Sequence, residues 1–211
     1  QAVRHLSKVF KPAQPFIFIL GGAKFQTKLP LIKKYLGLAD HVFVAGALAN
    51  DLFKAKNWEI GASLVSKTVF DREILENPKL VLPVDVTVTK KDSSVVFKKP
   101  DEVFSDEYIA DVGPETLEQL KNLLSGAKTI VWNGPLGNYE IGFRDKTETL
   151  AKIIAKVTEE GCQSVIGGGD TIASINTLGL NGKFSFISTG GGAMLDFLVD
   201  ETLPGIKALE K

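Results

Sequence analysis

Six short apolar runs, most of them followed by glycine, constrain the fold of this chain more than any other feature. They are rich in isoleucine, valine and phenylalanine and mostly do not alternate with polar residues. Continuous apolar character is typical of strands buried on both faces, as in a parallel sheet. The runs are FIFIL (16–20), VFVA (42–45), LVLPV (80–84), TIVW (129–132), SVI (164–166) and FSFIS (184–188).

Segments with a helical pattern lie between most of these runs. Strands and helices that alternate at this spacing indicate a βαβ series with right-handed crossovers. We therefore predict a single α/β domain: a three-layer αβα, Rossmann-like fold around an open, mainly parallel six-stranded sheet. Residues 86–110 alternate in polarity and predict a small hairpin or loop excursion. The predicted helices are 31–36, 48–56, 68–75, 115–124, 148–157 and 171–178.

Five of the six predicted strands are followed by glycine within two residues. In open α/β sheets, ligands bind beyond the carboxyl ends of the strands. Glycine lets backbone N–H groups approach a ligand closely, and a following helix N-terminus favours phosphate. The pattern therefore predicts a nucleotide-sized phosphate site at this edge. The five segments are GGAK (21–24), GALAN (46–50), NGPLG (133–137), GGGDT (167–171) and TGGGA (189–193).

The common nucleotide-binding fingerprints are absent: the chain has no G-x-x-x-x-G-K-[ST] segment, and GGAKFQ breaks the G-x-G-x-x-G pattern. Two lysines, Lys24 and Lys28, follow the first glycines. We expect Pro30 in the first helical turn, which would put Lys28 near the helix N-terminus and Lys24 in the preceding loop. A lysine there is unfavourable unless an anion offsets it, so we favour phosphate contact over two solvated lysines.

Other polar residues at the same edge have alternative interpretations. Asp170 would be either the cap of a helix or a ligand of Mg²⁺, which is commonly held by one carboxylate and substrate phosphates. Glu140 would be a solvated loop charge or an acceptor for ribose hydroxyls. Asn133 and Pro135 could both be simple turn residues.

Composition excludes several classes of protein. The 211 residues carry 25 basic and 25 acidic side chains, so no basic stripe for nucleic acid or a membrane surface is expected. No apolar run approaches the ~18 residues of a membrane helix. The single cysteine, Cys162, cannot form an internal disulfide, which favours the cytoplasm. The chain begins at Gln1, and we expect it to be a piece of something longer.

Taken together, the motifs resemble the phosphoglycerate kinase family, specifically its C-terminal, nucleotide-binding half. WNGP, GGGDT and STGGGA are the most specific motifs, and the matching segments cover nearly the whole chain in order. These segments are 15–28, 81–85, 111–116, 129–137, 164–171, 184–198 and 203–209.

The resemblance implies an enzyme that transfers a phosphoryl group between 1,3-bisphosphoglycerate and Mg-ADP. Lys24 would contact the transferred phosphoryl group and Lys28 the α-phosphate side, while Asp170 would hold Mg²⁺. The remaining implied roles fall to residues along the phosphates (Gly168, Gly169, Thr171), at a helix N-terminus (Gly190, Gly191, Gly192), at the ribose (Glu140) and in the adenosine pocket (Gly22, Gly46, Asn133, Pro135).

The resemblance also implies a domain organisation. Residues 1–14 would be an inter-domain helix remnant and linker, and 15–211 the nucleotide-binding domain. The N-terminal domain that holds 3-phosphoglycerate would be missing. Two departures from the family pattern are Ala45 and Ala47, which stand in place of glycines and would narrow the adenine slot. Lys146 also stands where the family usually has a glycine.

Three functional hypotheses remain open. The chain would be half of a kinase, binding Mg-ADP or Mg-ATP as a monomer with little or no catalysis alone. None of its three arginines lies in a glycine turn, which fits a site that needs a partner domain. Alternatively, it would be a stand-alone adenine-nucleotide-binding module or sensor. A third possibility is a degenerate scaffold whose pocket Ala45 and Ala47 have closed.

Overall fold

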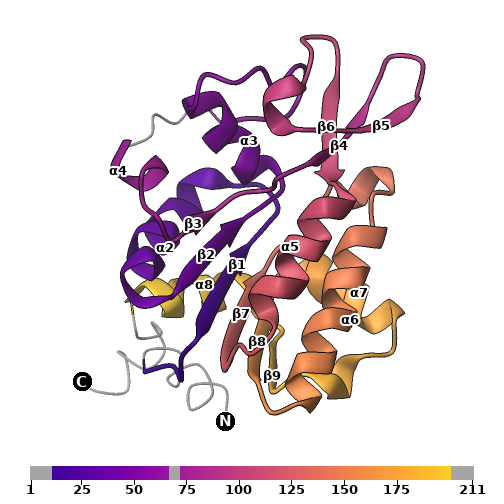
Figure 1. Ribbon diagram of the computed structural model, residues 1–211. Helices are drawn as coiled ribbons and strands as arrows, with labels where there is room; N and C mark the ends of the chain where they lie inside the picture. Colours follow the sequence, from indigo (N-terminus) through magenta and orange to yellow (C-terminus); the bar gives the residue numbers. More distant parts are fainter. Residues whose placement is uncertain (1–10, 67–71, 201–211) are drawn as a thin grey trace.

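The main sheet has six parallel strands in the order β3-β2-β1-β7-β8-β9 (Figure 1). The computed structural model describes residues 11–66 and 72–200. The predicted strands are thus present, and all six run in one direction. Their bounds are β1 (Phe16–Leu20), β2 (His41–Val44), β3 (Leu80–Val81), β7 (Thr129–Asn133), β8 (Gln163–Gly167) and β9 (Phe186–Ser188).

Helices cover both faces of this sheet, because successive side chains of a buried strand point to opposite faces. In β1, Phe16, Phe18 and Leu20 pack into a cluster with α2 and α8, whereas Ile17 and Ile19 pack into another with α5, α6 and α7. The predicted three-layer αβα fold is confirmed. The helices are α2 (Phe25–Leu38), α3 (Ala47–Ala55), α4 (Arg72–Leu75), α5 (Pro114–Leu124), α6 (Asp145–Glu159), α7 (Gly169–Thr177) and α8 (Gly191–Asp200).

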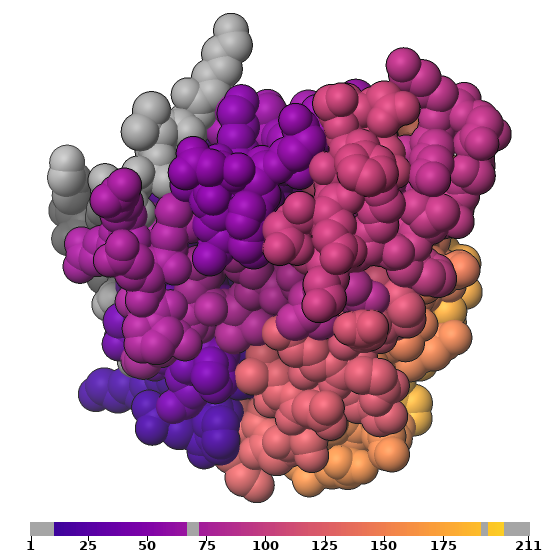
Figure 2. Space-filling model, turned by 45° about the horizontal axis from the view of Figure 1, so that its top comes forward, coloured from indigo at the N-terminus to yellow at the C-terminus, as the bar shows by residue number. Residues whose placement is uncertain are grey.

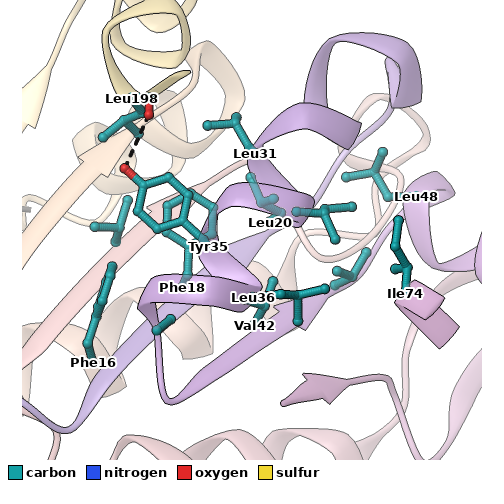
Figure 3. Close-up of a cluster of buried hydrophobic side chains, with 14 of the residues drawn as sticks. Phe16, Phe18, Leu20, Leu31, Tyr35, Leu36, Val42, Leu48, Ile74 and Leu198 are labelled. Carbon is teal, nitrogen blue, oxygen red and sulfur yellow. Dashed lines mark hydrogen bonds between the residues drawn. The ribbon is translucent and has the colours of Figure 1, made fainter. Parts of the chain in front are cut away.

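Aromatic side chains join the first strand to the helices on its face (Figure 3). The ring of Phe18 stacks on Tyr35 of α2 with centroids 4.0 Å apart, and Phe16 meets the same ring edge-on. The Tyr35 hydroxyl donates to the carbonyl of Leu198 in α8 at 3.4 Å. These contacts hold the last described helix against the first.

A second, antiparallel sheet stands at one end of the molecule. It consists of β4 (Val86–Thr89), β5 (Val95–Lys98) and β6 (Tyr108–Val112), in the order β5-β4-β6. The hairpin predicted in 86–110 is β4–β5, but the third strand was not predicted. Buried Asp85, just before β4, accepts hydrogen bonds from the N–H groups of Glu115 and Thr116 and so ties this sheet to the start of α5.

Some predicted bounds were wrong. Residues 80–84 form only the two-residue strand β3 at the sheet edge, where Pro83 has no N–H for a ladder. Pro30 lies inside α2 and not in its first turn, because the helix already begins at Phe25. Of the helix predicted at 68–75, α4 covers the last four residues, and 67–71 lie outside the described residues.

Both ends of the chain bear on earlier predictions. Residues 1–10, most of the predicted helix remnant and linker, lie outside the described residues, as does the matching segment 203–209. No helix in the described part of the chain has the length and apolar character needed to cross a bilayer.

Candidate functional site

The strand order reverses between β1 and β7, which lie side by side. The chain leaves β1 toward β2 on one side and leaves β7 toward β8 on the other. In an open α/β sheet a ligand binds in the crevice that this divergence creates beyond the strand ends. The first and third glycine segments, after β1 and β7, therefore meet at the place where a ligand site is expected.

Backbone contacts join these two loops. The N–H of Gly21 donates to the carbonyl of Asn133 at 2.9 Å, and that of Gly22 donates to the carbonyl of Pro135 at 2.8 Å. A Cβ on Gly21 would overlap the Pro135 carbonyl. Glycine is required here for close backbone approach, and the structure brings Gly22, Asn133 and Pro135 together.

The loop after β2 joins the same group. Gly46 has φ 65° and ψ −154°, a conformation that is essentially restricted to glycine. A Cβ there would lie 2.6 Å from the Gly22 nitrogen. Gly46 thus presses directly on Gly22, and α3 begins at the next residue.

Lys28 lies where the loops after β1 and β7 meet, close to Gly22 and Gly134. Its side chain is buried, and its Nζ donates to the Gly21 carbonyl at 2.6 Å. Burial, with a smaller contribution from Lys24, lowers the pKa of Lys28 to about 8, and Asp170 opposes this shift. Among the described residues, the ammonium group therefore has a carbonyl partner but no ion pair that fully offsets its charge.

Lys24 precedes α2 in a left-handed conformation, with φ 65° and ψ 56°. Residues other than glycine and asparagine rarely adopt it, and such outliers concentrate at functional sites. The Lys24 side chain is exposed and makes no capping bond. Within the described part of the chain its amine has no hydrogen-bond or ion-pair partner, so it can meet a ligand or solvent.

The start of α7 supplies the next part of the edge. Gly168, with φ 96°, is the cap, and Gly169 is the first helical residue. The Thr171 hydroxyl is buried and accepts a hydrogen bond from the Gly134 N–H at 3.0 Å. Asp170 is exposed in the first turn, so the alternative that it caps the helix is wrong.

Four further predicted residues have distinct surroundings. Asn133 is buried at the end of β7, and its Nδ2 has no hydrogen-bond partner among the described residues. Glu140 is exposed on the short 3₁₀ helix η3 (Tyr139–Ile141). Helix α8 begins at Gly191 directly after β9, so Gly191 and Gly192 lie at its N-terminus, as predicted.

A pocket of about 240 Å³ opens among these loops. Of the predicted residues, Gly22, Gly46, Pro135, Glu140 and Asp170 line it. Lys24 instead lines a neighbouring hollow, which shares Ala23, Ala47 and Leu64 with the first. The predicted residues that do not line the first pocket are Lys24, Lys28, Asn133, Gly168, Gly169, Thr171, Gly190, Gly191 and Gly192.

One wall of this pocket was not predicted. It comprises all of β6, from Tyr108 to Val112, together with Asn50 and Phe53 of α3. Residues 108–112, just before the Gly113-Pro114 pair, are mostly apolar or aromatic, which is typical of a strand, and this composition could have indicated β6. Its place beside the glycine loops could not be read from the sequence, because it depends on how the second sheet packs.

The fold and the pocket define a doubly wound α/β protein with its candidate ligand site at the topological switch point. The family model of phosphoglycerate kinase matches residues 1–201. The chain therefore belongs to the phosphoglycerate kinase family.

Individual relatives agree with this assignment. The phosphoglycerate kinase of Oenococcus oeni is 42% identical over 211 residues, covering 95% of this chain and 52% of that protein. That of Orientia tsutsugamushi is 40% identical over 227 residues, covering 98% and 54%. The solved structure of phosphoglycerate kinase from Coxiella burnetii superposes with a TM-score of 0.87 at 37% identity, covering 99% of this chain and 56% of that one. The chain thus spans about half the length of these relatives.

Proposed function

We propose that the chain is the nucleotide-binding half of a phosphoglycerate kinase, which binds Mg-ADP or Mg-ATP and needs a further domain for catalysis. The observation that carries this proposal is the convergence of separate glycine loops on one pocket at the switch point, with Lys28 and Asp170 beside it. Phosphoryl transfer by such a protein would belong to glycolysis, in the cytoplasm.

The basic and backbone groups would bind the phosphates. Lys24 would contact the transferred phosphoryl group, and Lys28 would exchange its bond to the Gly21 carbonyl for one to the α-phosphate side. Gly168, Gly169 and Thr171 lie at the N-terminus of α7, where free N–H groups favour an anion. Gly191 and Gly192 would do the same from α8, aligning and stabilising charge during transfer.

The nucleoside would occupy the pocket beyond these groups. Glu140 would accept from the ribose hydroxyls, and Gly22, Gly46, Asn133 and Pro135 would shape the adenosine site. Ala45 is buried in the core and does not line the pocket, so only Ala47 would narrow the slot. The open pocket supports nucleotide binding over the degenerate-scaffold hypothesis.

Magnesium fits this site only together with a nucleotide. The described residues include no group of three or more His, Cys, Asp or Glu side chains that could hold a metal ion. Asp170 offers one exposed carboxylate at the phosphate loops, and Mg²⁺ is commonly held by one carboxylate plus substrate phosphates. The metal would neutralise phosphate charge there, with Asp170 as its protein ligand.

Calorimetry on the 211-residue chain tests the proposal. We expect Mg-ADP to bind while turnover of phosphoglycerate and ATP stays negligible without the further domain. Ordinary kinase turnover by this chain alone would overturn the proposed division into halves. Nucleotide binding that the addition of the remaining domain does not convert into turnover would favour the stand-alone nucleotide module.

Replacing Asp170 with asparagine is expected to weaken Mg-ADP binding about 10-fold while leaving metal-free ADP almost unchanged, since the amide is a poorer Mg²⁺ ligand. Dissociation constants with and without Mg²⁺ measure the difference. Asp196→Asn, which removes a charge from α8, is the control. Equal weakening of the two ADP forms would show that Asp170 acts without the metal.

At Lys28, the binding of ADP should take up a proton near pH 8 and almost none near pH 6. The reason is that burial lowers the pKa of Lys28 to about 8, and a phosphate beside it would raise that pKa again. Titrations in two buffers of different ionisation enthalpy measure the uptake, and the difference between wild type and Lys28→Met is the part that Lys28 contributes. Equal uptake in wild type and Lys28→Met would mean that Lys28 keeps its carbonyl bond and does not contact phosphate.

A further inference from the structure

One end of the pocket lies between α3 and β6. Phe53 of α3 and Ile109 of β6 line it and belong to one hydrophobic cluster. In Figure 2, which turns this end forward, the purple residues around α3 lie beside the magenta residues of the second sheet. Asn138 Nδ2 donates to the Tyr108 hydroxyl at 2.8 Å, so these two pocket residues already satisfy each other in part.

Asp111 is the acidic residue of this unpredicted wall. Its side chain is buried, and its Oδ1 accepts the Val112 N–H at 2.8 Å. Gly137, which also lines the pocket, leaves the space that the carboxyl group fills, because a Cβ there would overlap it. Within the described residues, no hydrogen bond reaches Oδ2. One oxygen of a nearly buried carboxyl group in the pocket wall is therefore available to a ligand.

Asn50 provides a second, independent sign that this end awaits a ligand with hydrogen-bond donors. Its side chain lines the pocket and is only 3% exposed. Its Nδ2 donates to the Leu64 carbonyl at 3.1 Å, which fixes the orientation of the amide. The Oδ1 then has no partner in the described part of the chain, and an unpaired buried acceptor is costly.

Asp111 changes protonation in the neutral range. Burial raises its pKa to about 7, against the Val112 N–H bond and Lys146, which lower it, while Asp145 raises it further. Lys146 and Asp145 come from α6, and Glu140 of η3 lines the same pocket. Since Oδ1 accepts the Val112 N–H, the proton belongs on Oδ2, next to an acceptor.

We propose that Asp111 reads the Watson–Crick edge of the base and sets the purine preference of the pocket. As the acid, it offers a donor beside an acceptor, which matches N1 and the 6-amino group of adenine. As the carboxylate, it offers two acceptors, which match the adjacent N1–H and 2-amino donors of guanine. This inference rests on the proposed nucleotide site and adds its specificity-determining residue.

The test is the ratio of the dissociation constants of Mg-GDP and Mg-ADP for the 211-residue chain at about pH 6 and about pH 8.5. We expect the preference for ADP to fall about 10-fold from the lower to the higher pH. Deprotonation of Asp111 removes its paired hydrogen bonds with adenine and creates paired hydrogen bonds with guanine. Titration of Lys28 near the phosphates affects both nucleotides alike and cancels in the ratio.

Two variants separate the role of Asp111 from a structural one. Asp111→Asn mimics the protonated acid and should keep a preference for ADP that no longer changes with pH. Asp111→Ala should lose both the preference and its pH dependence. Asp92→Asn, the same charge change in the exposed β4–β5 turn, should behave as wild type. Thermal melting establishes that each variant is folded.

Each remaining outcome has one meaning. A wild-type ratio that does not change with pH, or a ratio that still changes in folded Asp111→Asn, overturns the assignment of Asp111 while leaving the nucleotide site intact. Binding of neither nucleotide by the wild-type chain overturns the proposed function, and this inference falls with it.

Discussion

Replacing Lys24 with alanine is expected to lower the rate of phosphoryl transfer about 10²–10³-fold, the usual effect of removing one donor that acts on developing charge. The assay uses a chimera in which this chain replaces the matching half of the Oenococcus oeni enzyme. The affinity for ADP should change much less, because Lys24 lies outside the pocket that would hold the nucleoside. Steady-state rates and nucleotide titrations on the same preparations measure the two effects.

The left-handed backbone at Lys24 allows a sharper control. Lys24→Gly removes the amine but suits φ 65° better than lysine does, so this variant should be at least as stable as wild type. It should nevertheless lose as much rate as Lys24→Ala. Lys152→Ala, an exposed lysine on α6, should leave the rate unchanged. Normal turnover in Lys24→Gly would remove the Lys24 amine from the reaction.

Replacing Gly46 with alanine is expected to lower the free energy of unfolding by about 3 kcal/mol and to abolish measurable ADP binding. The strained backbone costs about 1–3 kcal/mol for a residue with a Cβ. That Cβ would also lie 2.6 Å from the Gly22 nitrogen, so the two loops would have to separate. Denaturant unfolding measures the first effect and calorimetry the second.

Gly37 offers the matched control for this substitution. It lies within α2, and a Cβ there would meet no atom within 4 Å. Gly37→Ala should therefore raise stability by about 0.5–1 kcal/mol and leave binding unchanged. If Gly46→Ala were as stable as wild type, the contact between the β1 and β2 loops would not be a structural requirement.

The main sheet was predictable because its signals are local. A continuously apolar run such as 16–20 can be satisfied only by burial on both faces, and the glycines after it indicate close approach. Pro30 shows where such rules fail. A proline suits the first turn of a helix, yet here α2 begins earlier and tolerates the proline inside, since packing of its apolar face outweighs one lost hydrogen bond.

The candidate site was predictable only in part. Gly22, Gly46, Pro135, Glu140 and Asp170 line one pocket, as expected of residues that follow parallel strands. The wall formed by β6 was missed, because nothing local indicates which distant segment will cover a sheet edge. The competing interpretations of Asp170 had the same origin, since a cap and a first-turn residue differ only by the position where α7 begins.

By itself, the sequence determined the parallel sheet, the two helical layers and the edge at which the glycine loops meet. These features follow from the preference of apolar side chains for burial and from the backbone freedom of glycine, both of which are properties of the individual residue. Only the tertiary structure decided that Lys28 is buried against the Gly21 carbonyl, that Gly46 presses on Gly22, and that Asp111 faces the pocket. The reason is physical: protonation, hydrogen bonding and steric fit depend on neighbours that the chain brings together from distant segments.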